Sequence, residues 1–169
     1  MTEVRAAAPA DADEVARLHV RSWRSAYRGL IADDYLDGLS PGAVLDRYTF
    51  GRVGLRVSST LVAVDGHAIR GFATAGLCRD DELPNPGELM ALYVDPAHVG
   101  AGLGTLLLTA ARDRLRAVGV ARAVLWVLDA NTRARGFYER GGWRSDGACR
   151  TARFGNQTAR LVRYRLEPV

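Results

Sequence analysis

The chain has 169 residues, a formal net charge of +4 and 48% hydrophobic residues. This length suits one domain with a single core, here over residues 1–169, and the composition excludes a disordered chain. No apolar run approaches the length of a membrane span, and the first residues lack an apolar segment of signal-peptide length. We therefore expect a cytoplasmic protein with no membrane partner. Cys78 and Cys149 are too few and too far apart in sequence for a metal site or a disulfide scaffold, and the histidines lack ligand spacing, so we expect no metal.

The first half of the chain predicts a strand, a helical region and a hairpin. Asp11 or Asp13 begins a helix that Gly29 ends, with acidic residues in its first turn. Trp23 and Tyr27 fall at helical spacing in it, which is typical of core residues, although both are also candidates for lining a pocket. The expected elements are a strand at 3–7, helices at about 11–28, 31–39 and 41–50, and paired strands at 60–64 and 68–78.

The centre of the chain is a strand, a glycine-rich turn and a helix. Leu89–Val94 is an apolar run that predicts a buried strand, and Asp95-Pro96 stops it. Gly100-Ala101-Gly102-Leu103-Gly104 follows, and helical spacing of apolar residues runs from Thr105 to about Ala117. Such a turn presents backbone N–H groups to an anion, and its glycines allow close approach. We favour phosphate binding over a plain tight turn, because three glycines in five residues exceed what a turn requires.

Two common phosphate-binding motifs do not fit this turn. A Walker A loop is excluded because no Gly-Lys-Ser/Thr ends the turn and the chain contains no lysine. A Rossmann fingerprint needs G-x-G-x-x-G after the first strand of its domain, whereas here the third glycine is Gly104 and the turn lies past mid-chain. A nucleotide-binding oxidoreductase is therefore the weakest interpretation, and absence of NAD binding would dispose of it.

The C-terminal part predicts three more strands and a helix. Residues 121–128 form an apolar strand, which we expect to run parallel to its predecessor through a helical crossover. Asn131 can cap a helix at 132–140, and strands follow at 143–153 and 159–166. Residues 112–169 carry 13 arginines against five acidic residues, which indicates either an anionic ligand or an arginine-rich solvated surface. No basic stripe is interleaved with stacking aromatics, so we expect no nucleic-acid partner.

Two segments, by their order and their separation along the chain, resemble the two motifs of the GNAT superfamily of acyl-CoA-dependent N-acetyltransferases. Leu92-Tyr93-Val94-Asp95-Pro96 through Gly104 resembles that family's pyrophosphate-binding motif A. Asn-Thr-Arg-Ala-Arg-Gly-Phe-Tyr-Glu-Arg-Gly-Gly-Trp, at residues 131–143, resembles its motif B. With the flanking strands, the resemblance covers most of the chain. It implies an α/β (α+β) fold, a mixed and mostly antiparallel seven-stranded sheet flanked by helices, whose two central strands are splayed to admit CoA.

The resemblance also implies how acetyl-CoA, the cosubstrate, would be held. The backbone of Leu92 and Val94 would pair with the pantetheine arm like an added strand, and the Leu92 N–H would polarise the acetyl carbonyl. The amides of Gly100–Thr105 would hold the pyrophosphate. The family usually has Arg or Gln where Val99 stands, so one side-chain contact to the pyrophosphate is absent. Asn131 either binds the cofactor or caps its helix. The implied cofactor-binding residues are Leu92, Tyr93, Val94, Val99, Gly100, Ala101, Gly102, Leu103, Gly104, Thr105 and Asn131.

Tyr138 and Glu88 are the candidate catalytic residues. By resemblance, Tyr138 is the general acid, because a neutral phenol has a proton to give to a departing thiolate; the alternative is a core aromatic. Glu88 stands where the histone-acetyltransferase branch keeps its catalytic glutamate, so it is either a general base or a strand-entry charge that faces solvent. Other branches place a glutamate on the following strand, where this chain has Trp126.

The sequence therefore predicts acetyl-CoA-dependent N-acetylation of a primary amine, by direct attack in a ternary complex. The alternative is a non-catalytic acyl-CoA-binding regulatory or interaction module, and a Tyr138→Phe variant discriminates between the two. The acceptor is a small molecule or a peptide, and a homodimer is compatible with the resemblance. Acidic residues either attract the cationic amine or are solvated surface; these are Asp33, Asp34, Asp37, Asp80, Asp81 and Glu82.

Overall fold

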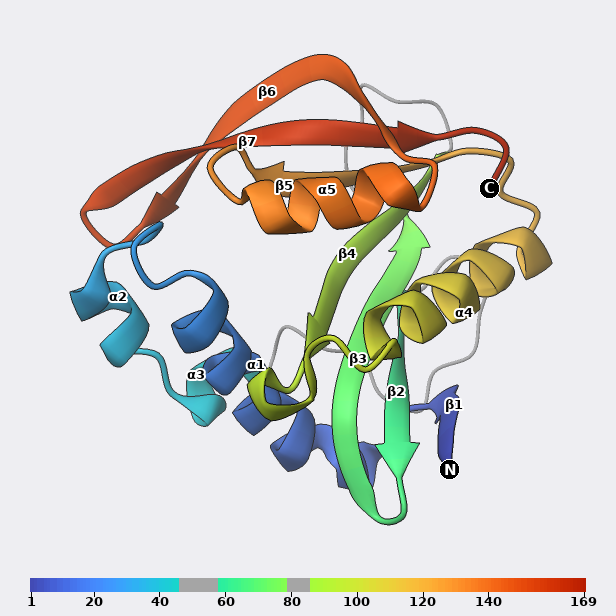
Figure 1. Ribbon diagram of the computed structural model, residues 1–169, viewed down its shortest axis with the longest axis horizontal. Helices are drawn as coiled ribbons and strands as arrows, with labels where there is room; N and C mark the ends of the chain where they lie inside the picture. The colour runs from blue at the N-terminus through green and yellow to red at the C-terminus, as the bar shows by residue number, and fades with distance from the viewer. Residues whose placement is uncertain (46–57, 79–85) are drawn as a thin grey trace.

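Figure 1 shows the computed structural model, which describes residues 1–45, 58–78 and 86–169. One seven-stranded sheet runs in the order β1-β2-β3-β4-β5-β7-β6. All neighbouring strands are antiparallel except β4 and β5, which are parallel and joined through a helix. The sheet is thus mixed and mostly antiparallel, as expected. The strands are β1 (Thr2–Ala6), β2 (Ser59–Asp65), β3 (Ala68–Leu77), β4 (Gly87–Val94), β5 (Ala123–Leu128), β6 (Arg144–Phe154) and β7 (Gln157–Leu166).

Five α-helices occupy the described residues. Ser40 begins the third one, since its side chain accepts a hydrogen bond from the amide of Ala43, and proline follows it at the first helical position. The expected continuation of this helix to residue 50 and the acidic loop at 80–82 lie outside the described residues. The helices are α1 (Ala12–Ala26), α2 (Asp33–Asp37), α3 (Pro41–Val44), α4 (Leu103–Ala117) and α5 (Thr132–Arg140), with 3-10 turns η1 (Pro9–Asp11) and η3 (Pro96–His98).

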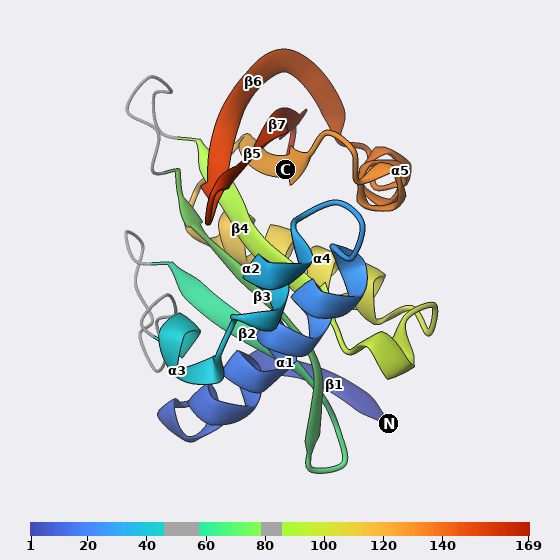
Figure 2. The same cartoon turned by 90° about the vertical axis from the view of Figure 1, so that its left-hand side faces the viewer.

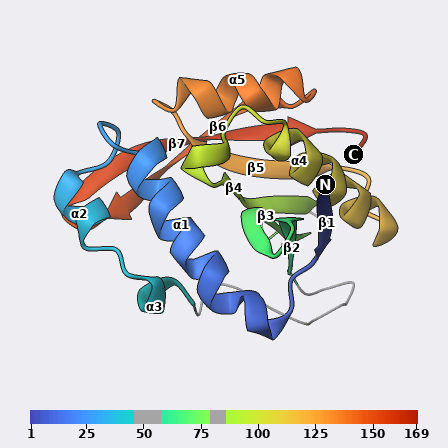
Figure 3. The same cartoon turned by 60° about the horizontal axis from the view of Figure 1, so that its bottom comes forward.

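The strands separate the helices into two groups because successive side chains point to opposite faces of the sheet. On β3, Ala73 and Ala75 belong to a core with Leu107 and Leu115 of α4. Phe72, which directly precedes Ala73 and so points to the opposite face, belongs to a core with Val15 and Leu18 of α1 instead. Figure 3 shows α1 and α4 on the two sides of β2–β4, and α5 covers the β5–β7 part of the sheet.

The sheet parts between its two parallel strands. Pairing of β4 with β5 covers only Gly87, Glu88 and Leu89, although β4 continues to Val94 and β5 to Leu128. On the other side of β4, Thr74 pairs with Ala91 and Ala75 with Leu89, so that Met90 is an extra, bulged residue. A bulge bends its strand, and this one lies where the pairing with β5 ends. Figures 1 and 2 show β2–β4 turning away from the β5–β7 layer, which confirms the expected splay.

The glycine-rich helix start differs from the expectation by two residues. α4 begins at Leu103 rather than at Thr105, with Gly102 as its N-cap. Gly104 therefore lies inside the first helical turn and is not part of the preceding loop. In the parts of the chain that the structure describes, no helix is both long enough and apolar enough to cross a bilayer.

Candidate active site

A cavity of about 710 Å³ occupies the gap between the parted strands. Its walls come from the ends of β4 and β5, from the start of α4 and from α5, and on the opposite side from α1 and β6. Most of the residues predicted from the sequence line it, namely Glu88, Leu92, Tyr93, Val94, Val99, Gly100, Gly102, Gly104, Thr105, Asn131 and Tyr138. Ala101 and Leu103 do not line it, and the Leu103 side chain is buried in the protein.

The start of α4 is shaped as an anion site. Gly100 and Gly102 have φ of 91° and 82°, a left-handed conformation that residues with a Cβ adopt at a cost. A Cβ at either position would meet nothing within 4 Å, so both glycines face open space. The first amides of a helix have no partner within the helix and carry the positive end of its dipole. Main-chain N–H groups between Gly102 and Thr105 are therefore the donors offered to an anion here.

Gly104 has a different role, because a Cβ there would lie 3.3 Å from the ring of Phe137. The missing side chain lets α5 pack against the first turn of α4.

Arg133 lies one turn before Phe137 on α5 and also lines the cavity, so it brings a positive charge to the end of the cavity near the start of α4. Val99 is 43% exposed beside the loop. Asn131 accepts a hydrogen bond from the amide of Ala134 at 3.2 Å, so it caps α5 as well as lining the cavity.

Among the described strands, none pairs with one edge of β4 where this strand lines the cavity. The Asp95 N–H donates to the carbonyl of Arg70, on the β3 side, at 2.8 Å. Because backbone groups alternate between the two edges of a strand, those of Leu92 and Val94 point to the other edge, from which β5 has parted. The Val94 carbonyl accepts a hydrogen bond from the Ser22 hydroxyl of α1 at 3.3 Å, which agrees with that direction.

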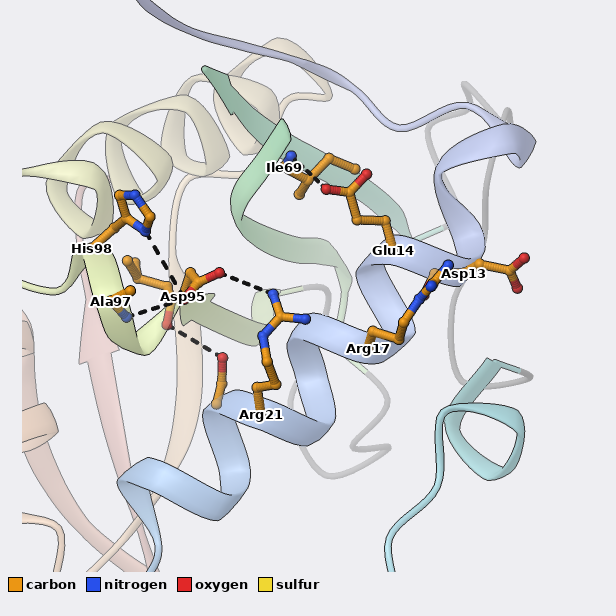
Figure 4. Close-up of polar contacts among 10 residues, drawn as sticks. Asp13, Glu14, Arg17, Arg21, Ile69, Asp95, Ala97 and His98 are labelled. Carbon is orange, nitrogen blue, oxygen red and sulfur yellow. Dashed lines mark hydrogen bonds and ion pairs between the residues drawn. The ribbon is translucent and has the colours of Figure 1, made fainter. Parts of the chain in front are cut away.

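A cluster of polar contacts fixes α1 to the end of β4 (Figure 4). Asp95 accepts hydrogen bonds from the Arg21 guanidinium at 2.9 Å and from the Ala97 amide at 3.0 Å. Burial raises the pKa of the Asp95 carboxyl, but these donors outweigh it and hold that pKa below its ordinary value. Glu14, two helical turns before Arg21 on α1, accepts a hydrogen bond from the Ile69 amide of β3 at 2.8 Å. The glycine-rich loop therefore starts from an anchored strand end.

Tyr138 lines the cavity from α5, and its ring packs against Phe137 and Trp143, with centroids 5.3 Å and 6.2 Å away. Trp143 is fully buried and donates its backbone N–H to the Tyr138 carbonyl at 3.0 Å. Burial, and then the neighbouring phenol of Tyr93, raise the pKa of Tyr138. The phenol consequently stays protonated at neutral pH and is a hydrogen-bond donor there.

Glu88 reaches the cavity from the opposite face of the sheet. It pairs in register with Val124 of β5, whereas its neighbour Leu89 packs toward α4. The residue is only 3% exposed, so the interpretation of Glu88 as a solvent-facing charge is wrong. Trp23 and Tyr27 of α1 line the same side. These two aromatics are thus both pocket-lining and core residues, the two interpretations that the sequence allows. Trp23 belongs to a buried core, and Tyr27 packs against that core.

Two phenols meet on this face. The hydroxyls of Tyr27 and Tyr93 lie 3.4 Å apart, and burial together with that contact raises the pKa of Tyr27 well above its ordinary value. Both side chains line the cavity, and their hydroxyls place polar groups beside the Trp23 ring.

Sequence reasoning missed several cavity residues, among them Ser22, Arg133, Arg140 and Arg150. Ser22 sits between predicted core positions of α1, and no pattern distinguishes it. Arg133 falls inside the segment that resembles motif B, where helical spacing from Phe137 could have identified it. Arg150 lies on β6, whose exposed residues show no alternation that marks a cavity side. Among the described residues, no cluster of His, Cys, Asp and Glu could hold a metal ion.

The class of protein to which this fold and cavity belong is an acetyltransferase, as the comparison with family models shows. The model of the acetyltransferase (GNAT) family matches residues 17–143, and the chain belongs to that family. YuaI of Bacillus subtilis, named an N-acetyltransferase, is 30% identical over 132 residues, which are 78% of this chain and 74% of that protein. A probable N-acetyltransferase of Mycobacterium tuberculosis is 30% identical over 145 residues, 85% of this chain and 80% of that protein.

A solved structure gives the fold independently. The PaiA N-acetyltransferase of Thermoplasma acidophilum, crystallised in complex with coenzyme A, superposes with a TM-score of 0.74. The match covers 96% of this chain and 98% of that one at 18% identity. The family match and the two named relatives identify this chain as an N-acetyltransferase.

Proposed function

We propose that the protein transfers the acetyl group of acetyl-CoA to a primary amine, by direct attack in a ternary complex. The observation that carries this proposal is the free edge of β4, which ends beside a helix start with two left-handed glycines. These two features suit an extended donor with a phosphorylated end. The strand edge can pair with its amide-rich arm, and the unpaired amides at the helix start can bind its phosphates. The cavity opens from this edge toward an aromatic wall on the other face of the sheet.

Donor binding rests on the chain's own backbone. The outward groups of Leu92 and Val94 hydrogen-bond the donor's arm, and the amides at the start of α4 hold its pyrophosphate. Arg133 adds positive charge from α5, which offsets the missing side-chain contact at Val99. Acetyl-CoA supplies a thioester, whose carbonyl carbon takes the amine and whose thiolate departs. The Leu92 N–H stabilises the charge that develops on the carbonyl oxygen.

Proton transfer is divided between the two faces. Glu88, buried on the α1 face, takes the proton that the ammonium must lose before its nitrogen can attack. Tyr138, on the α5 face, gives its proton to the departing sulfur, since its raised pKa keeps the phenol protonated until the thiolate forms. Donor and acceptor therefore enter from opposite faces of the sheet and meet at the parted strands, which requires no covalent intermediate on the protein.

A non-catalytic acyl-CoA-binding module is the second candidate, and Val99 favours it because it weakens the expected phosphate contacts. Tyr138→Phe separates the two, since it removes the hydroxyl but keeps the ring that packs on Trp143. For an enzyme, CoA release with an amine panel should fall about 100-fold while acetyl-CoA binding stays unchanged.

Tyr35→Phe is the matched control, because it removes a phenol hydroxyl from a tyrosine of α2 that does not line the cavity. Unchanged CoA release in Tyr138→Phe would contradict the assignment of Tyr138. Absence of CoA release in the unmodified protein, together with tight acetyl-CoA binding, would favour the non-catalytic module.

A further inference from the structure

The acceptor face of the cavity holds an arginine that no carboxylate of the described residues neutralises. Arg150 of β6 lines the cavity, and its guanidinium carbon lies 4.2 Å from the centroid of the Trp126 ring. Within the described ranges 1–45, 58–78 and 86–169, no acidic side chain forms an ion pair with it. The neighbouring Arg163 differs, because it pairs with Asp146 at 2.7 Å, with both side chains 15% exposed.

Strand register places Arg150 on the same face of the sheet as Glu88. On β5, Leu128 packs with α1 and α2, so Trp126, two residues earlier, points to that face as well. Arg150 pairs with Leu161 of β7, which packs against the same core. Glu88 pairs with Val124, two residues before Trp126, and so shares the face. Tyr138 and the start of α4 lie on the other face, with the proposed donor.

The stack on Trp126 prepares Arg150 for recognition of an anion. The indole ring restrains the plane of the guanidinium and limits the rotamers of the Arg150 side chain. Binding of a ligand therefore has less side-chain freedom to remove. The N–H groups at the edge of the plane then match the two oxygens of a carboxylate. An unpaired arginine at the wall of a half-apolar cavity is a specificity element of the kind that fixes a ligand's orientation.

We propose that the amine acceptor carries a carboxylate, which Arg150 binds while Glu88 receives the amine end. This inference rests on the proposed function and names its substrate class. The two charged side chains, on one face and of opposite sign, suit a substrate with an ammonium at one end and a carboxylate at the other. Arg150 acts by holding the acceptor and takes no part in proton transfer.

The test uses a series of amino acids of increasing length, each with its neutral amide. The probes are glycine, β-alanine, 4-aminobutanoate, 6-aminohexanoate and L-phenylalanine, with CoA release measured at saturating acetyl-CoA. At one or more lengths, the carboxylate should exceed its amide in kcat/KM by at least about 10-fold, since a hydrogen-bonded ion pair is lost in the amide. The length that is preferred reports the distance between the two subsites.

Variants of Arg150 assign that preference to the residue. Arg150→Ala should raise KM for the carboxylate and bring it level with its amide, with kcat and acetyl-CoA affinity unchanged. Arg150→Lys should restore part of the preference, because an ammonium keeps the positive charge but lacks the two parallel N–H donors of a guanidinium. Arg153→Ala is the control, since Arg153 lies on the same strand, is exposed and does not line the cavity.

Three results would overturn the inference. The first is an equal kcat/KM for each amide and its carboxylate in the unmodified protein. The second is a preference for the carboxylate that persists in Arg150→Ala. The third is binding of acetyl-CoA without CoA release for any carboxylate. Turnover of amides alone would leave the acetyltransferase proposal standing. If acetyl-CoA did not bind and no probe released CoA, the proposed function itself would fail.

Discussion

Glu88 illustrates how the place of a residue in a strand decides where its side chain lies. Its neighbours Gly87 and Leu89 point toward α4, where a Cβ on Gly87 would lie 2.9 Å from Leu115 and from Val120. Alternation therefore directs Glu88 to the opposite face and into the cavity. The pairing with β5 ends one residue later, so the carboxylate stands at the point where the sheet opens.

Replacement of Glu88 by Gln tests its role as the base. At pH 7 we expect turnover to fall about 100-fold with no change in acetyl-CoA affinity, because the carboxylate lies on the acceptor face. The loss should shrink as the pH approaches about 10, where solvent deprotonates a free primary amine without help. A pH profile of kcat/KM from 6 to 10 measures this.

Glu3→Gln, an exposed substitution on β1, should follow the unmodified profile throughout. A Glu88→Gln variant with full activity at pH 7 would remove the base from the mechanism.

At the scale of elements, the Asp95 carboxylate joins α1 to the end of β4. Its pKa lies below the ordinary value in the folded protein, so it binds fewer protons there than in the unfolded chain near pH 4. The stabilisation is therefore complete above the unfolded pKa of about 3.9 and is lost as the pH falls through the lower folded value. Asp95→Asn should cost about 1 kcal/mol in the free energy of unfolding at pH 7, because Arg21 is half exposed and solvent screens the pair.

Urea unfolding at pH 7 and at pH 3 measures the effect. The difference between Asp95→Asn and the unmodified protein should shrink at pH 3, where the native carboxyl is protonated in part. Asp34→Asn, on the exposed side of α2, is the control and should change neither value. A deficit that is equal at both pH values would show that charge at Asp95 does not stabilise the fold.

Element order and type could be predicted from the sequence because they depend on local patterns. Apolar runs and helical spacing give the strands and helices, and Gly and Pro give their ends. The expected start of α4 at Thr105 is two residues late because the glycine pattern assigns Gly104 to the loop, whereas Gly104 is helical and packs on Phe137. The bulge at Met90 left no pattern at all, since it depends on pairing with both neighbouring strands. The splay was expected only from family resemblance.

The candidate site was predictable where it is built from contiguous chain and unpredictable where it is built from distant strands. The glycine-rich segment Gly100–Gly104 and the helix with Tyr138 are local features that short motifs reveal. The burial of Glu88 and the stack of Arg150 on Trp126 arise from register across β4, β5, β7 and β6. No local spacing in the sequence reports that register.

For the whole molecule, the arginines of residues 112–169 have two roles. Three of them, Arg133, Arg140 and Arg150, line the cavity. Others bind backbone and side-chain oxygens that close the fold, as when Arg116 donates to the Val169 carbonyl at 2.6 Å or Arg135 donates to the Tyr164 hydroxyl at 3.0 Å. A guanidinium suits both uses because it offers five donors in a fixed plane. The C-terminal charge is therefore neither wholly a ligand site nor wholly solvated surface.

The central claim is that the parted sheet and the start of α4 bind acetyl-CoA. Isothermal titration of the unmodified protein and of Gly102→Val with acetyl-CoA, with NAD as the control ligand, tests it most directly. Valine at a φ of 82° is strained and places a side chain at the cavity's anion site. We predict one acetyl-CoA per chain, binding at least about 10-fold weaker in Gly102→Val, and no heat with NAD. Equal affinity in both proteins, or no acetyl-CoA binding in either, would contradict the account.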